Sequence, residues 1–311
     1  MNHNLIKRIF LIIPVLFALA ASVAEAAIPA AERQALIDIY NGTGGAGWTN
    51  STNWNGVDGT ECTWFGVTCN GAGDTVTAID LNANNLTGSL PATLNSLTNL
   101  VIFLAYDNQL TGSIPSLAGL TNLAYFYVNN NQLTGTIPSL AGLTNLARFY
   151  AYNNQLSGTI PSLADLTSLV VFWVNNNQLS GSIPPLAGLT NLVYFGVYHN
   201  QLTGPIPPLT GLDNLAHFRV NNNQLSGDVP AVPAPTNALL ASGSSLCPNY
   251  LNQTADAAWD TATGSTPWYA QCTAAPIPVA AAPIPTLSQW GMIVLSILLV
   301  GAAVFGLRRQ R

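Results

Sequence analysis

A repeat of 23 residues is the feature that most constrains what this chain can fold into. An asparagine recurs with one spacing of 24 residues and then five of 23, and a leucine follows two residues after each. The repeated asparagines are Asn84, Asn108, Asn131, Asn154, Asn177, Asn200 and Asn223. Since a unit this short cannot bury its own leucines, neighbouring units have to stack into one continuous core. The repeat therefore predicts a solenoid over residues 76–230.

Each unit follows the pattern L-x-x-L-x-L-x-x-N-x-L, with other apolar residues at some of the leucine positions. It continues into Thr or Ser, Gly, and an Ile-Pro, Leu-Pro or Val-Pro pair, as in Leu133 to Pro138. Seven units of this kind resemble the plant-type leucine-rich repeat found in receptor kinases and polygalacturonase-inhibiting proteins. The resemblance implies a curved right-handed coil with a parallel β-sheet on its concave side, 3-10 or short helices on its convex side, and disulfide caps. The recurring apolar positions should point inward, and each repeated Asn should bond backbone groups of its own and adjacent coils.

Residues 27–75 precede the repeats and carry the features of an N-terminal cap. Glu32 to Tyr40 can form a short amphipathic helix, and the segment from Cys62 to Cys69 reads C-x-W-x-G-V-x-C. This segment resembles the N-terminal cap of plant-type repeats, and the resemblance implies a Cys62–Cys69 disulfide. A metal site is not indicated, because the two cysteines lack a second pair of ligands.

Residues 231–272 follow the repeats and suggest a closing cap. Leu239, Ala241 and Leu246 look like a degenerate eighth strand, and Trp259 and Trp268 supply apolar bulk. We expect Cys247 to pair with Cys272, because the other connectivities would join opposite ends of the solenoid.

The two ends of the chain indicate export. Residues 1–26 combine Lys7 and Arg8, a short apolar run and a small-x-small finish, which is typical of a cleaved secretory signal, with an uncleaved anchor helix as the alternative. Residues 273–285 are an Ala/Pro-rich stalk, and 290–307 form an apolar stretch long enough to span a bilayer once, closed by arginines. Together with this stretch, a short motif resembles the IPTL-type C-terminal sorting tails (IPTL-CTERM) of bacterial exported proteins over residues 284–311. Its residues are Ile284, Pro285, Thr286, Leu287, Trp290 and Gly291.

The resemblance of the tail implies a bacterial cell-envelope or cell-surface protein whose tail is recognised by a membrane-embedded, sortase-like protease. A plain transmembrane anchor is the alternative. Both place the body of the chain outside the cytoplasm.

The strand positions that alternate with the core positions should face the concave side. Seven of the ten tyrosines fall there, with two arginines, a histidine and the one tryptophan of the repeats. The candidate ligand-binding residues are Tyr106, Tyr125, Tyr127, Arg148, Tyr150, Tyr152, Trp173, Tyr194, Tyr198, His217 and Arg219. Aromatic residues also favour strands and pair across them, so sheet stabilisation is an alternative explanation of the same pattern.

Composition and spacing favour a binding protein that is not an enzyme and needs no cofactor or metal. Residues 27–283 hold three basic and twelve acidic residues, which argues against nucleic-acid binding. His199 and His217 match no metal motif, and Asp80 with Asp107 is the single concave pair of carboxylates. The predicted function is recognition of a protein, peptide or glycan on the concave face. A structural spacer or matrix component, and an inhibitor of a secreted glycan-degrading enzyme, are the alternatives.

Overall fold

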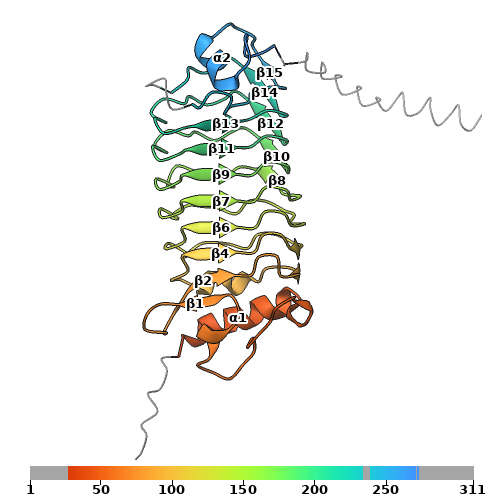
Figure 1. Cartoon of the computed structure of the whole chain (residues 1–311), viewed down its shortest axis with the longest axis vertical. Coiled ribbons are helices and arrows are strands. Elements are labelled where there is room, and N and C mark those ends of the chain that lie inside the picture. Colours follow the sequence, from red (N-terminus) through yellow and green to blue (C-terminus); the bar gives the residue numbers. More distant parts are fainter. Residues whose placement is uncertain (1–26, 234–238, 271, 273–311) are drawn as a thin grey trace, which may run out of the picture.

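The computed structural model describes residues 27–233, 239–270 and 272, and it shows an elongated solenoid of stacked coils (Figure 1). One long sheet runs up the stack in the order β1-β2-β4-β6-β7-β9-β11-β13. Only β1 and β2 pair antiparallel, and the remaining neighbours are parallel. Its strands are β1 Val67–Cys69, β2 Val76–Asp80, β4 Ile102–Leu104, β6 Tyr125–Tyr127, β7 Arg148–Tyr150, β9 Val171–Trp173, β11 Tyr194–Gly196 and β13 His217–Arg219. The leucine-rich-repeat fold predicted from the sequence is therefore confirmed.

A ladder of phenylalanines runs through the core behind this sheet. In the long sheet, the middle residue of each of the strands β4, β6, β7, β9, β11 and β13 is a fully buried Phe. Successive rings stack with centroids 5.4 to 5.8 Å apart. These residues are Phe103, Phe126, Phe149, Phe172, Phe195 and Phe218. Because the register pairs identical positions of adjacent coils, one apolar choice per repeat is enough to build a continuous core.

The repeated asparagines form a second ladder at the turn that follows the sheet. In the coil of Asn154, the side-chain Nδ2 donates to Val128 O of the preceding coil at 3.0 Å, and Oδ1 accepts from Leu133 N at 2.9 Å. The same pattern recurs at the other internal positions and continues at Asn249, whose Nδ2 donates to Val220 O at 2.9 Å. These bonds satisfy backbone groups that the tight turn leaves without a strand partner.

The outer side of the solenoid differs from expectation in two ways. A second parallel sheet, β15-β14-β12-β10-β8, lies there, and β3 Thr87–Gly88 pairs with β5 Gln109–Leu110. Its strands are β8 Ser157–Thr159, β10 Gln178–Gly181, β12 Gln201–Gly204, β14 Gln224–Gly227 and β15 Tyr250–Leu251. They form because the segment just before each Ile-Pro pair bonds to the previous coil, for example Ser157 N to Gly135 O at 2.7 Å.

Within the repeats that the structure describes, a 3-10 helix occurs in the first alone, as η3 Ala92–Ser96. The later repeats are one residue shorter at this point and replace the helix with a turn. Gly119 and its equivalents in three further repeats adopt positive φ angles of 79 to 90° in that turn, which glycine adopts without strain.

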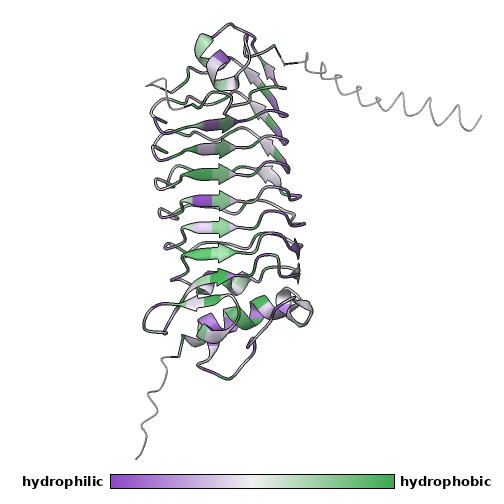
Figure 2. Cartoon of the chain, in the orientation of Figure 1, coloured by the Kyte–Doolittle hydropathy of each residue, from purple (hydrophilic) through white to green (hydrophobic). Residues whose placement is uncertain are grey.

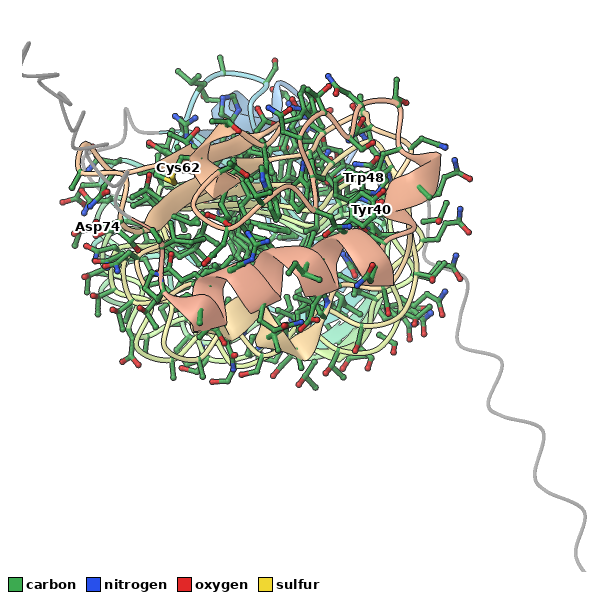
Figure 3. The ribbon with its side chains drawn as sticks, turned by 90° about the horizontal axis from the view of Figure 1, so that it is seen from below. Tyr40, Trp48, Cys62 and Asp74 are labelled. Atoms are coloured by element: carbon green, nitrogen blue, oxygen red, sulfur yellow. A yellow bond between two sulfur atoms is a disulfide. The ribbon has the colours of Figure 1, made fainter. Side chains whose placement is uncertain are left out.

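The N-terminal cap closes the first coil with helix α1 Ala30–Gly42, which lies across the end of the solenoid (Figure 3). The 3-10 turns η1 Gly45–Gly47 and η2 Glu61–Thr63 follow. Glu32 on α1 is buried and ties the helix to the repeats, because its carboxylate accepts from Val76 N at 2.7 Å and Thr75 Oγ1 at 2.6 Å. Cys62 and Cys69 form the disulfide that the resemblance implies.

The C-terminal cap is built around helix α2 Ala257–Thr263, which begins after the N-cap residue Asp256. Trp259 and Trp268 are buried in it, and Cys247 is bonded to Cys272 as predicted. Of the residues expected in a degenerate eighth strand, Leu239 and Leu246 are buried but Ala241 is exposed. Ala241 points outward because the chain turns at Leu240–Gly243, closing on itself through Gly243 N to Leu240 O at 2.8 Å.

The predicted signal, stalk and sorting tail, with the membrane span at 290–307, lie outside the described residues. Among the residues that the structure does describe, none belongs to a helix long and apolar enough to cross a membrane.

Candidate ligand-binding face

The solvent side of the long sheet carries an aromatic band, defined here as the eleven candidate residues predicted above. The first and third side chains of each strand flank its buried Phe and face away from the core, as the alternation in the sequence predicts. Ten of the eleven are half-buried, and Arg148 is exposed. In Figure 2 strand β7, which begins at Arg148, opens with a hydrophilic segment between the neutral or apolar strands on either side.

The rings of the band touch one another from strand to strand. Tyr127 and Tyr150 stack face to face with centroids 4.2 Å apart and planes 8° apart, and Trp173 lies edge-on to Tyr150 at 5.7 Å. Tyr152 packs on Trp173 at 4.3 Å, and the series continues through Tyr194. The band is therefore a continuous packed surface over β4 to β13.

A glycine makes room for the centre of the band, and sequence reasoning missed its role. Gly196 stands at the strand position that holds Trp173 in β9 and Tyr150 in β7. A Cβ atom there would lie 2.5 Å from Cε1 of Tyr194 and 2.9 Å from Cδ1 of Trp173. The rings of Tyr194 and Trp173 thus pack over the backbone of Gly196. The signal available in the sequence was one glycine in a column otherwise filled by large side chains.

The position two residues after the end of each strand from β4 to β13 of the long sheet holds tyrosine and asparagine in alternate repeats. In chain order it holds Tyr106, Asn129, Tyr152, Asn175, Tyr198 and Asn221. The structure buries Asn129 and Asn175 to 3% and 2% exposure, although the strand alternation predicts them to face solvent. Each lies between two coils that present a tyrosine, whose larger side chain covers the shorter amide. The alternation of tyrosine and asparagine at this position is the signal in the sequence that accompanies the burial of Asn129 and Asn175.

Three polar atoms at the centre of the band are buried without a hydrogen-bond partner. They are Nε1 of Trp173, Oη of Tyr194 and Oδ1 of Asn175. Unpaired buried polar atoms are uncommon and cost free energy. They mark the part of the band where a bound molecule could supply the missing partners.

The two arginines of the band lie over tyrosine rings. The Arg148 guanidinium carbon is 5.6 Å from the Tyr125 ring centre, and that of Arg219 is 5.9 Å from the Tyr194 ring centre. A hydrogen bond with Tyr127 raises the pKa of Arg148. Arg219 Nε also donates to Gly243 O at 3.2 Å. Both guanidinium groups are held in place by aromatic rings and neutral oxygens.

Burial raises the pKa of several tyrosines in the band. It raises the pKa of Tyr150 to about 12, with a further contribution from the neighbouring Tyr127. Burial also raises the pKa of Tyr194, against the opposing charge of Arg219. At the other end of the band, burial comes first in raising the pKa of Tyr106, and Asp80 and Asp107 add to it. These phenols are neutral hydrogen-bonding groups at physiological pH.

A small open cavity of about 250 Å³ lies at the C-terminal end of the band. Tyr198, His199, Arg219 and Asn221 line it from the repeats, and Ser242, Ser244 and Ser245 line it from the closing cap. The serines belong to a segment that sequence reasoning assigned to the cap alone. Across the described ranges, no three His, Cys, Asp or Glu side chains come together as metal ligands would.

Comparison with known protein families supports both the cap and the tail. Residues 29–70 match the leucine rich repeat N-terminal domain, and residues 282–311 match the IPTL-CTERM motif. The second match covers the predicted sorting residues, which supports the tail that was inferred from the sequence.

The curated relatives are plant receptor kinases. The chain is 36% identical over 64 residues, 21% of its length, to the receptor-like protein kinase HSL1 of Arabidopsis thaliana. It is 34% identical over 108 residues, 34% of its length, to the receptor protein kinase WSS1 of Oryza sativa subsp. japonica. It spans only 6% and 11% of these two proteins.

Solved structures that are similar to this chain include three complexes, two of them titled as plant receptors. The complex of PEPR1 with AtPEP1 matches with a TM-score of 0.60 and 25% identity over 75% of this chain and 37% of that one. The Arabidopsis thaliana GASSHO1/SCHENGEN3 ectodomain in complex with CASPARIAN STRIP INTEGRITY FACTOR 2 matches with a TM-score of 0.57 and 28% identity. This match covers 71% of this chain and 30% of that one. The plant peptide hormone receptor RGFR1 in complex with RGF2 matches with a TM-score of 0.51 and 36% identity. This match covers 56% of this chain and 28% of that one.

Proposed function

We propose that this chain is an exported, non-catalytic recognition protein that binds an extended peptide, or an extended segment of a protein, along the aromatic band. The observation that carries the proposal is the continuity of the band from Tyr106 to Arg219 on one open face. The six strands of the long sheet from β4 to β13, at about 4.8 Å spacing, give a surface about 24 Å long, which matches about seven residues of extended peptide. Tyrosine and tryptophan suit such a surface, because each combines an apolar body with a hydrogen-bonding tip.

Two further observations favour a peptide over a glycan. One solved structure that resembles this chain is a plant peptide hormone receptor, RGFR1, in complex with RGF2, and two others also contain a second named component. A sugar ring would need open aromatic faces to stack on. Tyr127 and Tyr150 cover one face of each other, and Trp173 lies against the second side of Tyr150. The middle of the band therefore offers ring edges and hydroxyl groups to a ligand.

The alternative is a structural spacer whose rings stabilise the sheet. The ring contacts within the band are those that such a role would require. The unpartnered Nε1 of Trp173 and Oη of Tyr194 favour recognition, because a purely stabilising cluster gains nothing from leaving polar atoms unpaired.

Alanine substitution tests the proposal. The full-length chain, in a mild non-ionic detergent, is screened against an array of nine-residue peptides, and the affinity of the tightest is measured by fluorescence anisotropy. Tyr150→Ala and Trp173→Ala should each weaken binding by about 2 kcal/mol or more, which is about thirtyfold. Gln155→Ala, on the outer side of the solenoid, is the matched control and should bind normally. Undiminished binding by the Tyr150→Ala/Trp173→Ala double variant would favour the spacer.

We also propose that the chain acts at a bacterial cell envelope or surface, where a sortase-like membrane protease recognises its tail. The match to the IPTL-CTERM motif supports this, and two disulfides suit an oxidising compartment. Mass spectrometry of envelope fractions tests it. Cleavage would remove the residues after the stalk, whereas an anchor that stays in the membrane would retain Arg311.

A further inference from the structure

We propose that the segment bound along the band is acidic and carries two carboxylates four residues apart, which pair with Arg148 and Arg219. This inference rests on the proposed function and adds the chemistry of the ligand to it. It also fixes which part of the band the acidic residues of the ligand occupy.

The first support is that these two arginines have no carboxylate partner. The described part of the chain holds three basic residues, and all of its ion pairs belong to the third, Arg33, which contacts Asp58 and Glu61. Twelve acidic side chains lie in the same ranges, so carboxylates are not scarce. Two unpaired cations on the same face of an otherwise acidic protein are left for an external anion.

The second support is that both guanidinium groups are already oriented. Arg148 is fixed by the Tyr125 ring and by Tyr127, and Arg219 by the Tyr194 ring and Gly243 O. None of these partners neutralises the positive charge. Orientation before binding lowers the entropy that a ligand has to overcome, and carboxylates form the strongest hydrogen bonds with arginine.

The third support is geometric. The sheet order β7-β9-β11-β13 places three strand steps between the two arginines, about 14 Å at 4.8 Å per step. The register places Arg219 two residues further along its strand than Arg148, which adds about 7 Å sideways. The two Cα atoms are thus about 16 Å apart by this reckoning.

An extended peptide rises about 3.3 Å per residue, and residues i, i+2 and i+4 share one side. Side chains at i and i+4 are therefore about 13 Å apart and face the same way, and the length of Arg and Glu side chains covers the remainder. Spacings of three or five residues put the second carboxylate on the far side. The band therefore predicts the spacing as well as the charge.

The charge of the side chains along the solvent side of the long sheet also changes sign from one end to the other. Asp80 on β2 and Asp107 after β4 are exposed at the N-terminal end, and their charges reach Tyr106. Arg148 and Arg219 lie toward the C-terminal end. An acidic segment would be repelled by the first end and attracted by the second. The acidic residues of the ligand should therefore lie over β7 to β13, and this polarity sets the register of the ligand along the band.

Synthetic peptides on the full-length chain test the inference. The probes are fluorescein-labelled twelve-residue peptides of Thr, Val, Gln and one Tyr, with two Glu residues spaced by three, four or five, and Gln in both places as reference. At 50 mM NaCl the spacing of four should bind about tenfold more tightly than the reference and than the other two spacings. Arg148→Gln and Arg219→Gln should each remove most of this gain, and 300 mM NaCl should reduce it. Asp213→Asn, an exposed change off the band, is the control.

Each other outcome overturns a defined part of the inference. If acidic and reference peptides bind equally while Trp173→Ala weakens both, the charge inference is wrong and the proposed function stands. If no peptide binds, both are wrong. Equal binding of all three spacings refutes the two-point contact. Arginine-dependent binding of an oligogalacturonate without any binding of the acidic peptides would show that the partner is a glycan. A charge reversal, Arg219→Glu, should prefer peptides in which Lys replaces one of the two Glu residues over the peptide that carries both.

Discussion

The ring of Tyr150 lies flat on the ring of Tyr127, with centroids 4.2 Å apart and planes only 8° apart. The two residues are direct neighbours in the parallel register of β7 and β6. Trp173 closes the far side of Tyr150, so the phenol at the centre of the band loses much of its water. The result is a pKa of about 12 for Tyr150, for which burial is the main cause.

This pKa predicts how stability changes at high pH. Below pH 10 the phenol is protonated in both the folded and the unfolded chain. Between pH 10 and about 12 the unfolded chain releases a proton that folded Tyr150 keeps, so the free energy of unfolding falls as pH rises. Urea unfolding at pH 8 and pH 11 should show a smaller loss for Tyr150→Phe than for the wild type. An equal loss in both proteins would contradict the assignment to Tyr150.

Gly196 gives the sharpest steric prediction for the band. Gly196→Ala would place a methyl group 2.5 Å from Tyr194 Cε1 and 2.9 Å from Trp173 Cδ1, so both rings have to move. We expect a loss of about 1–3 kcal/mol in the free energy of unfolding, measured in urea, and weaker peptide binding. Gly71→Ala is the matched control, because nothing lies within 4 Å of its added Cβ and its φ is not positive. Its stability should stay within about 0.5 kcal/mol of the wild type. Equal stability of the two variants would mean that the rings adjust freely.

Much of the fold could be predicted from the sequence because one residue choice repeats in register. Phe126 and Phe149 are 23 residues apart, and a stack that buries one of them buries both. The second sheet was less visible, since four of its five strands carry a glycine with positive φ and are followed within three residues by a proline, features that usually argue against a strand. Their pairing depends on the neighbouring coil, which a local reading does not contain.

The residues that form the band could be predicted one by one, but how deeply each side chain on this face is buried could not. Strand alternation placed Tyr127 and Trp173 correctly on the solvent side. It also predicted exposure for Asn175, which is buried, because alternation ignores the size of the neighbours on adjacent coils. The absence of carboxylate partners for Arg148 depends on where every acidic residue lies in space. Such a property appears only in the folded chain.

The asparagine ladder predicts that removing a single asparagine side chain lowers the free energy of unfolding. Asn177 Oδ1 accepts from Leu156 N at 2.9 Å, and its Nδ2 donates to Ala151 O at 2.9 Å, both in the preceding coil. Asn177→Ala leaves Leu156 N without its partner and removes one of the two hydrogen bonds that Ala151 O accepts, so it should lower the free energy of unfolding by about 1–3 kcal/mol. Urea unfolding measures it, with the exposed Gln155→Ala as a control that should stay within about 0.5 kcal/mol. A similar small effect for both would show that water replaces the amide.

The two disulfides should differ in what they contribute to stability. Cys62–Cys69 closes a sequence separation of 7 residues and Cys247–Cys272 one of 25. If a disulfide acts mainly by restricting the unfolded chain, the shorter loop contributes about 2–3 kcal/mol and the longer about 3–4 kcal/mol. The paired variants Cys62→Ser/Cys69→Ser and Cys247→Ser/Cys272→Ser, unfolded in guanidinium chloride, measure both. The short loop also encloses Trp64, which is 1% exposed in the cap core. A greater loss for the N-terminal pair would therefore mean that packing of the cap, rather than chain entropy, is what that disulfide protects.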